Sequence, residues 1–390
     1  MERRSNRGMK LSFACVAGLA SLLVVHTAIA QAPAGGFDDL ARRAEAAVDS
    51  DPALAASLYK EALDQRPSWP EGWFYLGGAL YRISRYTEAE NAFQKGLDLD
   101  SKNGAAWAFL GLAEYELGHL DQALSDIGKG EQLGLGANAG FESAVRQRAA
   151  MALIRSSLFD QAMAQLQPLA KQQQQQNSAA IIEAIGLCAL AIPLDPSKLP
   201  ESRRKVVTMA GQAMWAATRQ QPKDAEEGFL QLLALYPNEP GVHYAFGLYL
   251  MDTDQHAALA EFQKELSANP SHWPALLVTA FLETREGAPD DALQLAERAR
   301  KLAPSNYYWL CDAEAGRALL AKDQPEKAVP LFEASVKQQP DNAQTHYYLE
   351  QAYRRVGRKS DAQREKAEFV RLKSQQDPLS LPGVMNSTGR

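Results

Sequence analysis

Residues 73–93 read WFYLGGALYRISRYTEAENAF, and residues 107–127 read WAFLGLAEYELGHLDQALSDI. Both stretches begin with Trp-x-x-Leu-Gly and end with Ala-x-x-x followed by a large apolar residue. Each shared residue of the second stretch lies 34 positions after its counterpart in the first. A fixed period of this length indicates an architecture in which one supersecondary unit recurs along the chain.

The residue types inside each period predict a pair of helices joined by a tight turn. Glycine and alanine let the two helices approach closely, because a missing or small side chain leaves room for the partner. Neither helix can bury its apolar side within one pair, so neighbouring pairs must stack on one another. The residues that carry this repeat signature are Trp73, Leu76, Gly77, Ala89, Phe93, Trp107, Leu110, Gly111 and Ala123.

This pattern resembles that of the tetratricopeptide repeat family over about residues 37–374. The resemblance is strong at 70–130 and 225–372 and weaker at 131–224. It implies an all-α fold, a right-handed superhelical solenoid of antiparallel helix pairs. Successive later units end at proline, with spacings of 33, 34 and 36 residues between Pro237, Pro270, Pro304 and Pro340.

Composition and rhythm divide the chain into six expected segments. They are a signal peptide at 1–30, a flexible leader at 31–36, N-terminal repeats at 37–170, an irregular connection at 171–202, C-terminal repeats at 203–376 and a disordered tail at 377–390. The connection begins with a run of glutamines and later contains a Pro-Leu-Asp-Pro break. A boundary between two domains inside this connection is an alternative to one continuous array.

The first thirty residues predict export. Four basic residues precede an apolar run from Leu11 to about Val25, and Ala28-Ile29-Ala30 follows. This order is typical of a Sec-type secretory signal peptide, with cleavage expected after Ala30. A retained membrane anchor is less favoured, because the apolar run is short for a spanning helix. We therefore expect an exported bacterial protein in the periplasm or outside the cell, with no stable membrane insertion after cleavage.

Charge and cysteine content exclude some classes of protein. The chain has a formal net charge of −6, and an acidic chain repels phosphate backbones, so we expect no nucleic-acid partner. Only Cys188 and Cys311 follow the expected cleavage site, which is too few for a disulfide framework in a chain this long. Both are expected to be buried small apolar residues.

The resemblance implies that the first helix of each pair lines a concave groove that binds a partner. The groove residues expected from matching positions are Phe74, Tyr81, Arg82, Leu112, Tyr115, Glu116, Gln147, Arg155, Tyr244, Leu248, Met251, Arg317, Tyr347, Gln351, Arg354 and Arg355. Aromatic residues and arginine are the types that most often anchor protein interfaces. The last helix pair is rich in arginine and lysine, which we interpret as the polar outer cap of the array.

No catalytic or metal-binding pattern is present in the sequence. His-Glu-x-x-His, Cys-x-x-Cys, Gly-x-Ser-x-Gly and the phosphate-binding glycine loop are all missing. His243 and His346 fall where Trp73 and Trp107 fall in their own units, which predicts packing within a helix pair and no ligand role. Five residues two positions before the repeat alanine are expected to be helix N-caps: Thr87, Asp121, Asp160, Asp290 and Ser360.

These observations predict a non-catalytic scaffold or adaptor that binds a peptide or protein segment in its groove, exported to the cell envelope. No cofactor and no metal ion are expected, and the identity of the protein partner stays open. One alternative is an accessory subunit of outer-membrane or polysaccharide assembly. Another, from a different class, is a small-ligand binder or enzyme located in the irregular region 171–224.

Overall fold

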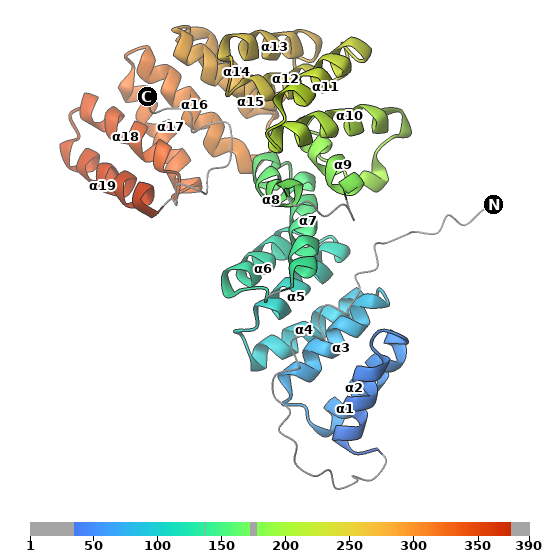
Figure 1. The fold of residues 1–390 in the computed structure, drawn as a ribbon. Helices are drawn as coiled ribbons and strands as arrows, with labels where there is room; N and C mark the ends of the chain where they lie inside the picture. The colour runs from blue at the N-terminus through green and yellow to red at the C-terminus, as the bar shows by residue number, and fades with distance from the viewer. Residues whose placement is uncertain (1–34, 137, 172–177, 376–390) are drawn as a thin grey trace. The chain divides into compact units, whose positions relative to one another are not determined.

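A computed structural model describes residues 35–136, 138–171 and 178–375, which are helical apart from the connecting turns (Figure 1). The predicted signal peptide, most of the leader and the predicted tail lie outside these residues. The chain divides into two compact units, of which unit 1 ends at Ser156 and unit 2 begins at Ser157. Each unit is a stack of helices that follow one another in sequence.

Unit 1 consists of helices that pack in chain order, so that each pair lies against the next. Their bounds are α1 Phe37–Ala47, α2 Pro52–Gln65, α3 Pro70–Arg82, α4 Tyr86–Leu99, α5 Gly104–Leu117, α6 Leu120–Leu133 and α7 Ala139–Arg155. The last helix, α7, packs on both α5 and α6. The end of the predicted leader is ordered, because Gly36 precedes α1 directly and the Gly35 carbonyl accepts a hydrogen bond from the side chain of Gln65.

Unit 2 continues the same arrangement. Its helices are α8 Phe159–Lys171, α9 Ser178–Ala189, α10 Glu201–Thr218, α11 Pro222–Leu235, α12 Val242–Leu250, α13 Gln255–Ala268, α14 Trp273–Glu286, α15 Pro289–Leu302, α16 Tyr308–Ala321, α17 Pro325–Gln338, α18 Ala343–Arg355 and α19 Lys359–Gln375, with short 3₁₀ turns η3 at Pro196–Lys198 and η4 at Ser305–Tyr307. Helix α8 packs on α9 and α10, so the described part of unit 2 begins before the predicted connection at 171–202.

Close approach within a pair depends on the glycines of the repeat signature. A Cβ atom added at Gly77 would lie 2.6 Å from the ring of Phe93, and one at Gly111 would lie 2.7 Å from the carbonyl oxygen of Ala123. The side chain of Phe93 is fully buried, and its ring stacks 5.7 Å from that of Phe109 in the next pair. The expected packing of one helix pair against the next is therefore confirmed.

In four helix pairs, the large ring at the start of the first helix makes the same hydrogen bond. The indole N–H of Trp73 donates to the carbonyl of Pro67, six residues earlier, at 2.8 Å. Trp107 does the same to Ser101 at 2.9 Å. Nε2 of His243 lies 3.0 Å from the carbonyl of Pro237, and Nε2 of His346 lies 2.9 Å from that of Pro340, again six residues earlier. The prediction that both histidines replace tryptophan as packing residues is confirmed.

The N-cap prediction is wrong. The five residues lie inside the first turn of their helices, because each helix begins one residue earlier than the expected cap. Helix α4 follows Arg85, α6 follows His119 and α15 follows Ala288, none of which forms a side-chain cap. The aspartates among the five still sit where the positive end of the helix dipole favours a negative charge.

The described residues contain no strand, and the all-α solenoid of antiparallel helix pairs is confirmed. Both late cysteines are free and buried, as expected. Within the described ranges, no helix combines the length and the apolar character that a membrane span needs.

Candidate binding faces

Three first helices of unit 1 bring a group of polar and aromatic side chains together. We call this group the first-helix face: Tyr81 from α3, Tyr115 and Glu116 from α5, and Arg148 and Arg155 from α7. The hydroxyl of Tyr81 donates to Oε1 of Glu116 at 3.5 Å. Nε of Arg148 donates to the same oxygen at 3.2 Å. The face is therefore continuous across α3, α5 and α7.

Both arginines of this face lie over one aromatic ring. The guanidinium carbons of Arg148 and Arg155 are 5.8 and 5.5 Å from the ring centroid of Tyr115. They are seven residues apart on α7, which places them two turns apart on the same side of the helix. Such contacts between a cation and a ring contribute about 0.5–2 kcal/mol each.

Arg155 differs from Arg148 in its partners. The guanidinium of Arg148 pairs with Glu116, whereas no carboxylate of the described residues lies within salt-bridge distance of Arg155. Its side chain is half-buried. Arg155 therefore presents a positive charge, already oriented by Tyr115, that an incoming carboxylate can pair with.

Burial and charge set the protonation of the face. Burial raises the pKa of Tyr81, and the negative charge of Glu116 raises it further. Burial alone lowers the pKa of Arg148, but Tyr81 and Glu116 outweigh that effect and raise the pKa overall. At neutral pH the hydroxyl of Tyr81 therefore keeps its proton, and Arg148 keeps its positive charge.

Some residues expected on this face belong to the core or to other contacts. Phe74, Leu112 and Gln147 are buried, and so are Tyr81 and Tyr115, so the expected exposure of these two tyrosines is not found. Arg82 donates to the carbonyl of Val48 at 2.6 Å and to Asp49 at 2.8 Å, which ties α3 to the end of α1. Sequence reasoning missed Arg148, although its spacing of seven residues from Arg155 could have identified it.

The corresponding residues of unit 2 are covered by other helices of the same unit. Tyr244 and Met251 are buried and Leu248 is half-buried. The start of α8 lies against this face, with Leu158 packed in the cluster that contains Leu277 and Tyr307. The expected exposure of Tyr244 and Met251 is therefore not found, because both pack in a hydrophobic cluster with residues of α13 and α14.

Arg317 on α16 is a buried structural residue. Its guanidinium donates two hydrogen bonds to Glu314, at 3.0 and 2.7 Å, and lies 4.5 Å from the ring centroid of Phe281 and 5.1 Å from that of Tyr348. Burial raises the pKa of Glu314, while the charge of Arg317 opposes the shift. Arg317 is therefore already fully paired within unit 2.

The last helix pair presents the remaining expected residues. Tyr347 is 40% exposed, Gln351 is half-buried, and Arg354 and Arg355 are exposed. Arg355 donates to the carbonyl of Leu320 at 2.7 Å. These residues form a second exposed surface, at the end of unit 2.

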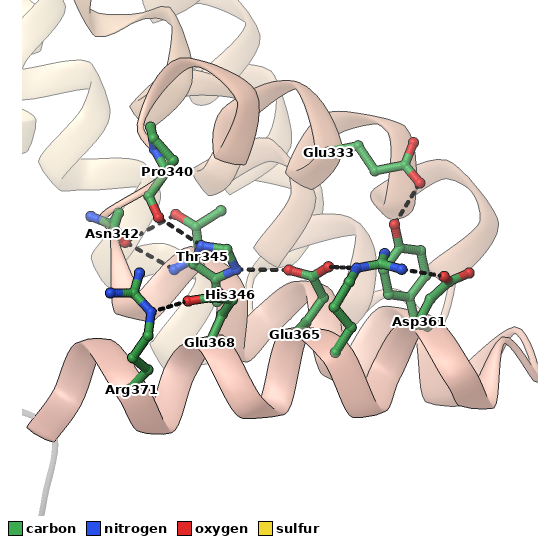
Figure 2. A network of polar contacts seen from close by, with 11 residues as sticks. Glu333, Pro340, Asn342, Thr345, His346, Asp361, Glu365, Glu368 and Arg371 are labelled. Atoms are coloured by element: carbon green, nitrogen blue, oxygen red, sulfur yellow. Dashed lines mark hydrogen bonds and ion pairs between the residues drawn. The ribbon is translucent and has the colours of Figure 1, made fainter.

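A polar network joins α18 to α19 and includes arginines of α19 (Figure 2). Nδ1 of His346 lies 2.7 Å from Oε2 of Glu365, whose other oxygen accepts from Arg364 at 3.1 Å. Arg364 also donates to Asp361 at 2.8 Å, and Arg371 donates to Glu368 at 2.6 Å. The arginines of α19 are thus paired within their own helix, as a solvated terminal cap requires.

One buried pair of carboxyl groups lies between α5 and α6. Burial raises the pKa of Glu114 to about 8, and the neighbouring charge of Asp126 adds to the shift. Oε2 of Glu114 is buried and has no hydrogen-bond partner among the described residues. The pair sits inside one helix hairpin, and within the described ranges no group of His, Cys, Asp and Glu is arranged to hold a metal ion.

The irregular region considered for an enzyme or small-ligand site is a helix stack. Helix α9 packs on α10, and α10 packs on α11. Gly186 and Gly211 make the first contact possible, since a Cβ at either position would lie 2.0 Å from a carbonyl of the facing helix. The described residues of this region therefore continue the repeat architecture.

Comparison with known proteins identifies the repeats in both units. The family profile described as "Tetratricopeptide repeat" matches residues 39–104, 79–132 and 314–368. The human Protein O-mannosyl-transferase TMTC3 is 30% identical over 70 residues, which cover 18% of this chain and 8% of that protein.

Several solved structures are similar at low sequence identity. MamA from Desulfovibrio magneticus is 21% identical, with a TM-score of 0.39, over 44% of this chain and 97% of that chain. Yeast Tom70 is 13% identical, with a TM-score of 0.37, over 87% and 77%. The repeat domain of P58(IPK) is 15% identical, with a TM-score of 0.28, over 83% and 98%.

Proposed function

The chain is a tetratricopeptide-repeat protein, and on that premise we propose that it is a non-catalytic scaffold that binds a polypeptide segment along the first-helix face of unit 1. One observation carries the proposal: Tyr115 orients two guanidinium groups on a face shared by three helices, and Arg155 has no acidic partner among the described residues. Aromatic rings and arginine at one place are typical of interface anchors. A segment that carries a carboxylate fits this chemistry.

The test uses site-specific photo-crosslinking of the full chain in its native host. A photoreactive phenylalanine at Glu116 or Arg155, both half-buried, probes the face, and the same residue at Gln94, exposed on the second helix α4, is the control. We expect one adduct of defined mass from the face positions and none from Gln94. Equal labelling at all three positions contradicts binding at this face.

A pair of arginine variants then tests the chemistry. Arg155→Ala removes the unpaired charge, whereas Arg146→Ala removes an arginine of the same helix that bonds to Glu142 at 3.0 Å. We expect Arg155→Ala to reduce the adduct at Glu116 about tenfold, the size of one charge-assisted hydrogen bond. Arg146→Ala leaves the adduct unchanged. The reverse order contradicts the proposed role of Arg155.

We further propose that the scaffold acts in the cell envelope after removal of residues 1–30. The order of basic, apolar and small residues at the start of the sequence supports this proposal. N-terminal sequencing of the protein from a periplasmic fraction tests it, with Gln31 expected as the first residue. Recovery of the protein in the cytosol with residues 1–30 intact contradicts it.

A further inference from the structure

A small cavity lies in unit 2, between the start of α8 and the first helices α12, α14 and α16. Its volume is about 40 Å³. Residues from four helices and one 3₁₀ turn line it, and the aromatic ones among them are Phe159, Tyr244, Trp273 and Tyr307. A water molecule needs about 10–15 Å³ of this kind of volume, so the cavity has room for a group the size of two or three waters.

The aromatic rings around the cavity are held by the surrounding packing. The rings of Trp273 and Tyr307 lie with centroids 4.5 Å apart at an angle of 53°. Tyr244 and Tyr307 are both buried, and the hydroxyl of Tyr307 accepts a hydrogen bond from the backbone N–H of Phe159. That N–H belongs to the first turn of α8 and has no carbonyl partner within the helix. The start of α8 is thus fixed against η4.

One carboxyl group lies among the residues that line this cavity. Asp160, in the first turn of α8, is exposed to solvent, and the packing around its carboxyl group raises its pKa above the ordinary value. No salt-bridge partner of Asp160 lies among the described residues. Its charge acts on Tyr244, Tyr307 and Cys188, because the pKa of each is raised by burial first and by Asp160 next. The carboxyl group of Asp160 is therefore close to the two tyrosine rings that line the cavity.

The cavity thus combines several aromatic rings with one acidic side chain that has no salt-bridge partner among the described residues. Both features attract a cation, and the apolar walls favour a cation that carries methylene groups. We propose that this cavity binds an alkylammonium group, the lysine side chain of a partner polypeptide. An ammonium group with its last one or two methylenes matches the volume, whereas a planar guanidinium is wider. The site is independent of the first-helix face of unit 1.

The experiment titrates the full chain with n-butylammonium chloride, and with n-butanol as the neutral probe of similar shape. The protein is labelled with 5-fluorotryptophan, and ¹⁹F spectra follow Trp273, whose resonance is assigned by its loss in Trp273→Phe. We expect butylammonium to shift this resonance with saturation, and butanol to bind at least about fivefold more weakly. Equal binding of both probes overturns the proposal.

Two asparagine variants test the carboxylate. Asp160→Asn keeps the shape of the side chain and removes its charge, and we expect it to weaken butylammonium binding about five- to tenfold. Asp224→Asn is the matched control, since Asp224 is exposed in the first turn of α11 and outside the cavity. Binding that is unchanged in Asp160→Asn, or weakened as much in Asp224→Asn, overturns the proposal.

Short peptides distinguish lysine from other side chains. Acetylated and amidated Gly-X-Gly, with X as lysine, arginine or norleucine, is titrated against the labelled chain. We expect the lysine peptide to shift the resonance of Trp273 at the lowest concentration and the norleucine peptide at the highest. Tighter binding of the arginine peptide than of the lysine peptide overturns the assignment to an ammonium group.

Discussion

Single glycines separate the effect of close packing from the effect of backbone flexibility. Gly111→Ala places a methyl group 2.7 Å from a backbone carbonyl of α6, and we expect it to lower the free energy of unfolding by about 1–3 kcal/mol. Gly128 lies inside α6 with nothing within 4 Å of an added Cβ. Gly128→Ala should therefore raise stability by about 0.5–1 kcal/mol. Urea unfolding of both variants measures the difference, and a similar change in both contradicts this placement.

The sequence predicted which residues build the repeat, but not which side chains face a partner. The roles of Gly77, Phe93 and His346 follow from their position in the period, because each contact lies within one helix pair or between adjacent pairs. The burial of Tyr244 was not predicted: its ring packs against Phe262 and against His272 at the start of the next helix pair. The period identifies the positions of side chains in each helix pair, but it does not report how far each side chain is exposed.

The stability of the helix pair α5 and α6 is expected to depend on pH. Burial, followed by the charges of Asp126 and Glu90, raises the pKa of Glu114 to about 8 from its ordinary value of 4.5. The folded state therefore binds a proton that the unfolded chain releases. This contribution to stability is complete below about pH 4.5 and is lost as the pH rises through 8.

We expect Glu114→Gln to remove this dependence. Glutamine is neutral at every pH, so the variant should be more stable than the wild type at pH 9, by roughly 1–3 kcal/mol, and similar to it at pH 5. Urea unfolding at several pH values in this range, followed in unit 1, measures how the stability of the wild type and of the variant changes with pH. A wild-type stability that changes between pH 5 and pH 9 in step with the variant would falsify the raised pKa of Glu114.

Trp107 and His346 occupy equivalent positions in two helix pairs, but only the loss of His346 leaves a buried carboxylate without its partner. Trp107→Phe removes one hydrogen bond to a backbone carbonyl and should cost about 0.5–1.5 kcal/mol. His346→Phe removes the equivalent bond and also one partner of the buried carboxylate of Glu365, so we expect a larger cost of about 2–4 kcal/mol. Thermal unfolding compares the two. Adding Glu365→Leu to His346→Phe should recover part of the loss, and no recovery contradicts this explanation.

The region 171–224 lacks a clear repeat pattern in the sequence, but its described residues form helices that pack in pairs like the rest of the chain. Helices α9 and α10 meet through Gly186 and Gly211, which replace the usual signature of tryptophan, leucine and glycine. A search for the tetratricopeptide pattern misses this pair, because its contact uses two glycines at positions that the pattern does not specify. The fold class was predictable across this region, whereas the pairing of α8 with α9 was not.

At the scale of the whole chain, the division between Ser156 and Ser157 predicts that a destabilising substitution affects only the unit that contains it. In a repeat array each helix pair depends mainly on its neighbours, so a local loss of stability spreads through contacts and stops where they are few. Gly111→Ala disturbs the packing of α5 on α6 in unit 1. Gly316→Ala is its counterpart in unit 2, since its Cβ would lie 2.8 Å from the ring of Phe332.

Amide hydrogen exchange of the full chain measures where each variant opens. We expect Gly111→Ala to increase exchange about fivefold or more in helices of unit 1, the effect of about 1 kcal/mol on local opening, and to leave α14 to α19 unchanged. Gly316→Ala should show the opposite distribution. Both substitutions add the same methyl group at the same position of the repeat. A difference in where exchange increases therefore shows which helices depend on each site, and does not reflect a difference between the substitutions. Increased exchange throughout the chain in either variant would mean that the two units unfold as one.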